Sequence, residues 1–220
     1  MPAILCVVGE HKAGKTRVIE ALLPALQARG LRVAAVKHST HSPDLDREGK
    51  DTWRYSQAGA RAVAICAPGR FALIKQVEGE ASLPAAAALL AGEVDLLLAE
   101  GFGALGLPRI EVAQAGASGA TSSADLLVAV VGDAPVATSA PQFRCDEIEP
   151  LADRVTAWLA TQAGPEVTLL VDGKPVPLNR FASEILARGV EGMVSALRGV
   201  PGAPSGIVVA VQPGRHGRET

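Results

Sequence analysis

Aromatic residues are scarce in this chain of 220 residues: they make up 3% of it, whereas hydrophobic residues make up 48%. A core with so few rings must consist mainly of Ala, Val, Leu and Ile side chains. Such cores are typical of α/β proteins, whose parallel strands are buried on both faces. A chain of this length can bury one core of this kind and carry a small appendage.

An excess of charge of one sign is also missing, because the formal net charge is only −2. This composition favours neither a nucleic acid nor an acidic membrane as a partner. The uncharged apolar stretches, such as residues 81–92, are too short to span a bilayer. Three charged residues, Glu10, Lys12 and Lys15, interrupt the first apolar run before it reaches the length of a signal peptide. We therefore expect a soluble, cytoplasmic protein.

Cysteine is rare as well, with three residues spaced far apart at Cys6, Cys66 and Cys145. This spacing favours free thiols in a reducing compartment over a disulfide framework. A metal site made of cysteines alone is not expected.

The sequence GEHKAGKT at residues 9–16 matches the pattern G-x-x-x-x-G-K-[ST] of a phosphate-binding loop, or P-loop. It follows an apolar run at residues 4–8 that predicts a buried strand. Residues 17–28 come next, with apolar side chains at helical spacing and Gly30 as the terminating residue. An ordinary glycine-rich turn with a surface lysine is the alternative, but both flanking elements are those that a P-loop requires.

A P-loop binds phosphate because its glycines let the backbone approach the anion, so that successive N–H groups and the helix N-terminus point at it. Lys15 would reach the β- and γ-phosphates, and the hydroxyl of Thr16 would bind Mg²⁺. The predicted nucleotide-binding residues of the loop are Gly9, Glu10, His11, Lys12, Ala13, Gly14, Lys15, Thr16 and Arg17.

Strands and helices alternate through the following chain. Strands are predicted at residues 31–36, 62–66, 71–77, 94–99, 109–112 and 126–131, and helices at 51–58, 82–90 and 150–160. This order predicts a three-layer α/β P-loop NTPase fold with a mostly parallel, doubly wound sheet over residues 1–163. Residues 62–66 and 71–77 are expected to pair antiparallel around Pro68-Gly69. Asp51 is expected to cap the helix that follows it.

Residues 164–220 are expected to form a small C-terminal ββαβ module. Asp172-Gly173 predicts a hairpin between two short strands, Asn179 predicts a helix cap, and residues 207–211 predict a last strand. The module contains no chemical motif, which favours a structural or interaction role.

Two acidic positions are candidates for catalysis and metal binding. Glu100 directly follows a buried strand, where P-loop proteins carry a second Mg²⁺ element, so we expect it to serve Mg²⁺ or to orient water. It could instead cap the next turn. Asp44 and Asp46 lie in a long polar loop after residue 36, and we favour Asp46 for Mg²⁺ or the attacking water. Both could also be solvated turn acids. Asp46, Glu100 and Lys15 are the predicted catalytic residues.

Basic residues of the same loop could contact phosphates. Lys37, Lys50 and Arg54 would supply positive charge, although loop lysines are often only solvated. His38 and His41 are three residues apart, which allows either a metal pair or contact with an anion.

The segment VKHSTHSPDLDREGKDTWRYSQAGA at residues 36–60, with LLLAEGF and PRIEV further on, resembles the MobB family of molybdopterin-guanine dinucleotide biosynthesis adapter proteins. The resemblance spans about residues 3–160. It implies a GTP-binding, usually dimeric P-loop protein with weak hydrolysis. Such proteins act beside a guanylyltransferase, MobA, that joins GMP to molybdopterin. The sequence departs from the family pattern at Pro43, at Gly103 where a Lys is usual, and at Ala113-Gln114 where an Arg is usual.

Guanine preference rests on this resemblance alone, because the sequence contains no N-K-x-D motif. Asp133, at the end of a predicted strand, is our candidate for reading the base. Two other functions remain open, a P-loop small-molecule kinase and a metal-insertion GTPase. A kinase would need a mobile lid, and no Arg-rich lid segment is evident. A metal-insertion GTPase would bind a transition metal at His38 and His41.

Overall fold

The computed structural model describes residues 1–40, 45–114, 116, 119–162, 167, 169–171, 174–176, 178–198, 207 and 209. The chain divides into two compact units. The first unit comprises Met1–Lys37 and Pro84–Thr220, and the second comprises His38–Leu83.

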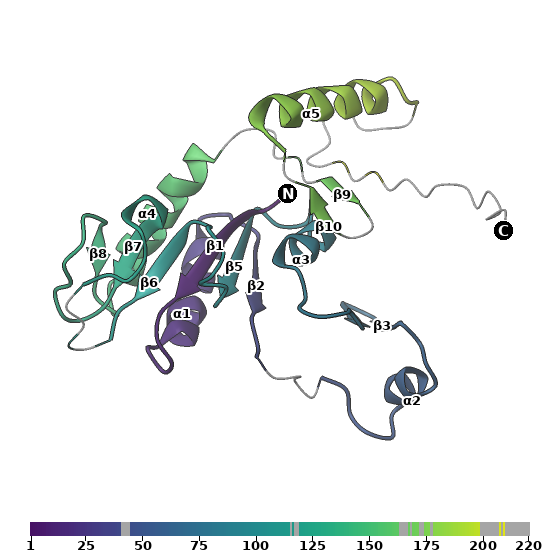
Figure 1. Ribbon diagram of the computed structural model, residues 1–220, viewed down its shortest axis with the longest axis horizontal. Helices are drawn as coiled ribbons and strands as arrows, with labels where there is room; N and C mark the ends of the chain where they lie inside the picture. The colour runs from purple at the N-terminus through teal and green to yellow at the C-terminus, as the bar shows by residue number, and fades with distance from the viewer. Residues whose placement is uncertain are drawn as a thin grey trace. The chain divides into compact units, whose positions relative to one another are not determined.

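The first unit is built on a six-stranded sheet in the order β2-β5-β1-β6-β7-β8, and all neighbouring strands in it are parallel (Figure 1). Its strands are β1 (Ala3–Val8), β2 (Val33–Lys37), β5 (Leu96–Glu100), β6 (Arg109–Val112), β7 (Leu127–Val131) and β8 (Gln142–Phe143). This parallel sheet with flanking helices confirms the predicted α/β class. The short strand β8 and the 3₁₀ turn Ala124–Leu126 were not predicted.

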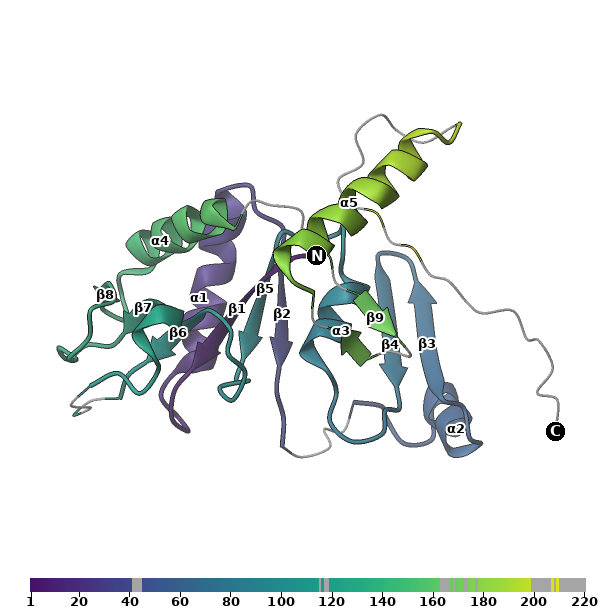
Figure 2. The same ribbon diagram turned by 45° about the horizontal axis from the view of Figure 1, so that its top comes forward.

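Helices α1 (Lys15–Ala28) and α4 (Ile148–Thr161) pack against each other and against one face of the sheet (Figure 2). The core between them is aliphatic apart from Trp158 and the partly buried Phe143. Alternate residues of a strand face opposite sides. Ile110 and Val112 belong to this core, so Arg109 and Glu111 of the same strand face the other side of the sheet.

The second unit contains α2 (Asp51–Gln57) and an antiparallel hairpin of β3 (Ala62–Ala67) and β4 (Arg70–Lys75). The hairpin confirms the predicted pairing around Pro68-Gly69. The predicted cap of α2 is wrong, because Lys50 occupies the N-cap position without a side-chain bond. Asp51 instead lies in the first turn, where a negative charge favours the helix dipole. Helix α3 (Leu83–Leu89) begins where this unit ends.

The C-terminal part contains the antiparallel strands β9 (Leu169–Val171) and β10 (Lys174–Val176), followed by α5 (Arg180–Ser195). Asn179 caps α5 as predicted, because its side chain accepts a hydrogen bond of 2.8 Å from the backbone N–H of Ala182. The predicted turn at 172–173 and most of 207–211 lie outside the described residues. The boundary near residue 164 lies outside them too and stays a prediction. Among the described helices, none combines the length and apolarity needed to cross a bilayer.

Candidate functional site

The loop at residues 9–16 joins β1 to α1 and needs glycine at two places. Gly9 has φ 141° and Gly14 has φ 99°, a left-handed region that favours glycine. A Cβ at Gly9 would also overlap the carbonyl oxygen of Val112 at the end of β6. The loop therefore depends on close backbone contact with the neighbouring strand.

Lys15 bends back over this loop. Its Nζ donates to the carbonyl oxygens of Gly9 and Glu10, at 2.9 Å and 2.6 Å. At the start of α1, the backbone N–H of Val18 donates a hydrogen bond to the carbonyl oxygen of Gly14. Since the earlier N–H groups of a helix have no partner inside it, they can bind an anion beside the Lys15 ammonium group. This arrangement fits the predicted phosphate site.

Three side chains meet at the start of α1 and the ends of β2 and β5. The Thr16 hydroxyl donates to Oε2 of Glu100 at 2.9 Å, and the Lys37 ammonium donates to Oε1 at 2.9 Å. The parallel register places Lys37 directly opposite Glu100. This arrangement brings Thr16, Glu100 and Lys37 together, and all three were candidates from the sequence.

The Glu100 side chain is 13% exposed. Burial alone would raise its pKa, but the hydrogen bonds from Lys37 and Thr16 and the charges of Lys37 and Lys15 outweigh it and lower the pKa. Glu100 is therefore ionised at neutral pH. A hydroxyl and a carboxylate oxygen side by side are hard oxygen ligands, so this pair fits Mg²⁺.

Asp133 lies just beyond β7, and its Oδ1 accepts a hydrogen bond of 3.1 Å from the backbone N–H of Cys145. Burial and the charge of Asp133 raise the pKa of the Cys145 thiol, and the charge of Arg17 opposes this. Asp133 and Arg17 are thus both near Cys145. The reading of a base by Asp133 stays a prediction.

The remaining sequence candidates belong to the second unit. Oδ1 of Asp46 accepts from the Thr52 hydroxyl at 2.9 Å, while Oδ2 is buried and has no hydrogen-bond partner among the described residues. Nε2 of His38 lies 2.5 Å from Oε1 of Glu80. Lys50 and Arg54 are exposed.

Two further candidates, His41 and Asp44, lie outside the described residues. Within the part of the chain that the structure describes, no three His, Cys, Asp or Glu side chains are grouped to hold a metal ion. The metal pair predicted at His38 and His41 therefore stays untested.

Sequence reasoning named Gln114, which follows β6, only as a departure from the MobB pattern and missed its contact with the P-loop. Its side-chain N–H donates to the carbonyl oxygen of His11 at 2.8 Å and so braces the P-loop. The bond joins residues 103 positions apart, and no local pattern indicates it.

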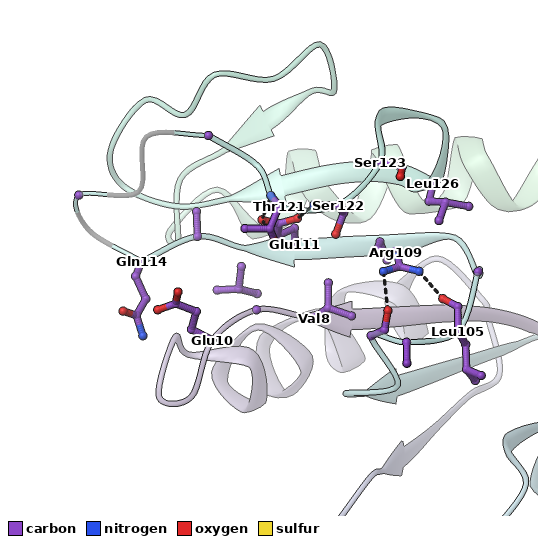
Figure 3. Close-up of a pocket in the computed structure, with 18 residues that line it drawn as sticks. Val8, Glu10, Leu105, Arg109, Glu111, Gln114, Thr121, Ser122, Ser123 and Leu126 are labelled. Atoms are coloured by element: carbon purple, nitrogen blue, oxygen red, sulfur yellow. Dashed lines mark hydrogen bonds between the residues drawn. The ribbon is translucent and has the colours of Figure 1, made fainter.

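A cavity of about 740 Å³ opens beside the beginning of the P-loop, on the sheet face that carries Arg109 and Glu111 (Figure 3). It is lined by Val8, Gly9, Glu10, Gly103, Ala104, Leu105, Gly106, Arg109, Glu111, Val112, Ala113, Gln114, Gly116, Gly119, Thr121, Ser122, Ser123 and Leu126. Sequence reasoning did not predict it. A volume of this size is within the range of small-molecule sites.

Arg109 shapes one wall of the cavity. Its guanidinium group donates to the carbonyl oxygens of Leu107 at 3.1 Å, Gly103 at 3.0 Å and Leu105. These bonds hold the loop between β5 and β6.

Glu111 lines the cavity two residues further along the same face of β6. Its carboxylate accepts from the backbone and hydroxyl of Thr121, at 2.7 Å and 3.0 Å, and from the backbone of Ser122 at 2.8 Å. Burial would raise its pKa, but hydrogen bonds from the Ser122 side chain, from the backbone of Thr121 and Ser122 and from the Thr121 hydroxyl outweigh it and lower the pKa. Glu111 therefore carries a negative charge into the cavity.

Comparison with known proteins identifies the family. A family profile described as "Molybdopterin guanine dinucleotide synthesis protein B", MobB, matches residues 4–133. The molybdopterin-guanine dinucleotide biosynthesis adapter protein of Escherichia coli (strain K12) is 31% identical over 170 residues, which are 74% of this chain and 97% of that protein. This chain belongs to the MobB family.

Other MobB proteins agree with this assignment. The adapter protein of Haemophilus influenzae is 31% identical over 158 residues, 71% of this chain and 89% of its own length. A crystal structure of molybdopterin-guanine biosynthesis protein B matches with a TM-score of 0.56 and 31% identity, over 71% of this chain and 99% of that one. These MobB proteins leave about a quarter of this chain unmatched.

Three of the positions at which the sequence is expected to depart from the MobB pattern lie at the cavity, and Pro43 lies outside the described residues. Gly103, Ala113 and Gln114 all line the cavity.

Proposed function

We propose that this chain binds GTP with Mg²⁺ at the P-loop, hydrolyses it slowly, and acts as an adapter in molybdenum cofactor biosynthesis. It would work beside a MobA-type guanylyltransferase that joins GMP to molybdopterin. The observation that carries the proposal is the Thr16–Glu100 pair at the mouth of the P-loop, 2.9 Å apart. The relatives named above support a role in this pathway, because they are molybdopterin-guanine dinucleotide biosynthesis adapter proteins.

Each residue has a defined task in this proposal. The backbone N–H groups of the loop and the Lys15 ammonium hold the phosphates. Thr16 and Glu100 hold Mg²⁺, which neutralises charge that develops on the phosphates. Lys37 keeps Glu100 ionised, because its ammonium group donates to the carboxylate.

We retain Asp46 as the residue that serves Mg²⁺ or the attacking water. Its Oδ2 is buried without a hydrogen-bond partner among the described residues, so this oxygen has bonding capacity to spare. Lys50 and Arg54 remain proposed phosphate or partner contacts, because both side chains are exposed. His38 is engaged with Glu80, which favours a structural or anion-contacting role over a metal site.

We propose that the β3-β4 hairpin contacts a second copy of this chain. Ile65, Phe71 and Leu73 are 52%, 68% and 43% exposed, and they lie on both faces of this two-stranded sheet. Isolated two-stranded hairpins are marginally stable in water, and exposed apolar patches mark interfaces. The three cysteines are free, which suits the reducing cytoplasm as the site of action.

The dimer is tested by light scattering on the eluting protein. We expect twice the monomer mass of 22.5 kDa for the wild type and the monomer mass for Phe71→Ser. Phe181→Ser in α5 is the matched control, because Phe181 is 71% exposed and lies outside the hairpin. A Phe71→Ser variant that remains dimeric would exclude the hairpin as the interface.

The cavity beside the P-loop favours a second function, that of a small-molecule kinase, because a phosphate acceptor could lie there. An experiment with GTP labelled at the γ-phosphate distinguishes the adapter function from the kinase function. The adapter function predicts slow release of inorganic phosphate, whether or not a pterin is added. Transfer of the label to an added pterin would instead identify a kinase.

A further inference from the structure

The Lys37 ammonium group lies beside the P-loop site with hydrogen-bonding capacity to spare. It donates to Oε1 of Glu100 at 2.9 Å, and the Lys37 side chain is 64% exposed. An ammonium group has three N–H donors, and among the described residues only Glu100 accepts from this one. Two of the three donors are therefore open to a ligand.

The charges around Glu100 leave an excess of positive charge. Burial raises the pKa of Glu100, whereas the hydrogen bonds from Lys37 and Thr16 and the charges of Lys37 and Lys15 lower it. Two ammonium groups thus act on a single carboxylate, which can neutralise only one of them. The remaining positive charge favours an anion at this position.

The strand order indicates which part of a nucleotide Lys37 faces. β1 leads into the P-loop, and β5 and β2 lie on one side of β1, whereas β6, β7 and β8 lie on the other (Figure 2). The candidate for reading the base, Asp133, follows β7, but Glu100 and Lys37 end β5 and β2. Because Mg²⁺ bridges the β- and γ-phosphates in sites of this kind, a cation bonded to the proposed Mg²⁺ residue Glu100 lies next to the last phosphate.

We propose that the Lys37 ammonium group donates to the γ-phosphate of the bound nucleotide and is a catalytic residue in its hydrolysis. The inference rests on the GTP binding proposed above. The oxygen of a water molecule bonds to the γ-phosphorus, and the bond from this phosphorus to the β–γ bridging oxygen breaks, with its electron pair left on GDP. One proton of the water stays on the released hydrogen phosphate and the other passes to solvent. Lys37 remains protonated and stabilises the charge on the phosphate oxygens during this step.

A direct contact with GTP can be separated from the effect of Lys37 on the charge of Glu100. In Glu100→Gln the amide oxygen can still accept from the Thr16 hydroxyl, but no carboxylate remains for Lys37 to keep ionised. A direct contact of Lys37 with the γ-phosphate persists in this background. An effect that acts only through Glu100 disappears from it.

The test is isothermal titration of the full-length protein with GTP and with GDP, which lacks the γ-phosphate. Lys37→Gln removes the charge but keeps an N–H donor for Glu100. It should lower GTP affinity roughly tenfold or more, the contribution of one charge-assisted hydrogen bond, and change GDP affinity less than about twofold. The same selective loss is expected in the Glu100→Gln background and, since Glu100 then has no metal to hold, in the absence of Mg²⁺.

Hydrolysis and two further variants complete the test. Phosphate release from saturating GTP in a single turnover should slow roughly tenfold or more in Lys37→Gln, and Lys37→Arg, which keeps the charge, should recover most of the rate. Lys75→Gln on β4 is the matched control, because the described contacts give Lys75 no carboxylate partner, and it should change neither affinity nor rate. Lys37→Met is the second neutral variant if circular dichroism shows that Lys37→Gln does not fold.

Equal losses of GTP and GDP affinity in a folded Lys37→Gln protein would overturn the inference. A selective loss that disappears in the Glu100→Gln background and without Mg²⁺ would overturn it too, because Lys37 would then act only on Glu100. An unchanged rate at saturating GTP would exclude the catalytic role. A wild-type protein that binds neither nucleotide contradicts the proposed function, whereas one that binds both, with no selective loss in Lys37→Gln, contradicts this inference alone.

Discussion

Nζ of Lys37 lies 2.9 Å from Oε1 of Glu100, and this ion pair joins the ends of two neighbouring parallel strands. The pair holds a nearly buried carboxylate in its charged form beside the hydroxyl of Thr16. Glu100 is therefore ionised, which is the form that the proposed Mg²⁺ site requires.

Lys37→Met should raise the pKa of Glu100, because burial raises it and the hydrogen bond from Lys37 is the foremost opposing cause. In the wild type the folded-state pKa lies below the unfolded value of about 4.3. The stabilisation of the fold by ionised Glu100 is thus present above the unfolded-state pKa, and it is lost as the pH falls through the folded-state pKa. The variant should lose about 1 kcal/mol of stability at pH 7 and less at pH 3.

Carboxyl NMR titration and urea unfolding at the two pH values check the Lys37 prediction. Lys75→Met on β4 is the control, because the described contacts give Lys75 no carboxylate partner. An equal loss of stability at pH 7 and pH 3 would contradict the assigned electrostatic role.

Gly9→Ala should abolish nucleotide binding and destabilise the fold by about 2 kcal/mol or more, because the new Cβ would overlap the Val112 carbonyl oxygen. Gly14→Ala is the matched comparison. Gly14 also has positive φ, but a Cβ there would meet no atom within 4 Å, so we expect this variant to lose only about 1 kcal/mol of stability. Thermal unfolding of both variants measures the difference, and equal losses would mean that contact with β6 is unimportant.

Asp46→Asn should slow GTP hydrolysis at least tenfold, roughly the contribution of one positioned acid, while leaving GTP affinity within about twofold. The amide keeps an oxygen for the Thr52 hydroxyl, so the local structure should survive. Asp51→Asn is the control, because Asp51 is exposed in the first turn of α2. Phosphate release under single-turnover conditions is the measurement. Equal rates for the two variants would leave Asp46 with a structural role only.

Removal of residues 164–220 should leave GTP binding unchanged, since the P-loop, Glu100 and Lys37 all precede them. Isothermal titration of the shortened chain, together with circular dichroism, checks this. A shortened chain that fails to fold would show that the C-terminal part belongs to the core of the nucleotide-binding unit.

The sequence was sufficient to predict the features that depend on local pattern. Residues 9–16 follow a strand and precede a helix, and Glu100 ends an apolar run, so their positions at one sheet edge follow from parallel topology. Asn179 was likewise predicted, because N-cap preference is local. Asp51 was placed wrongly by one position, since Lys50 has the extended conformation of an N-cap residue.

The cavity could not be predicted in this way. Its existence depends on which face of β6 the helices leave uncovered, and Arg109 and Glu111 look like ordinary surface charges in the sequence. Their partners, Gly103 and Thr121, are reached only once two loops fold over the strand. The brace from Gln114 to His11 depends on the same long-range packing.

Equilibrium binding of GTP, ATP and GDP in the presence of Mg²⁺, with Lys15→Ala as the paired variant, measures whether the P-loop binds a guanine nucleotide. We predict preference for GTP over ATP in the wild type. Lys15→Ala should stay folded and lose roughly 100-fold in affinity, because it lacks one charge-assisted phosphate contact. Preference for ATP, or unchanged affinity in a folded Lys15→Ala variant, would contradict the account.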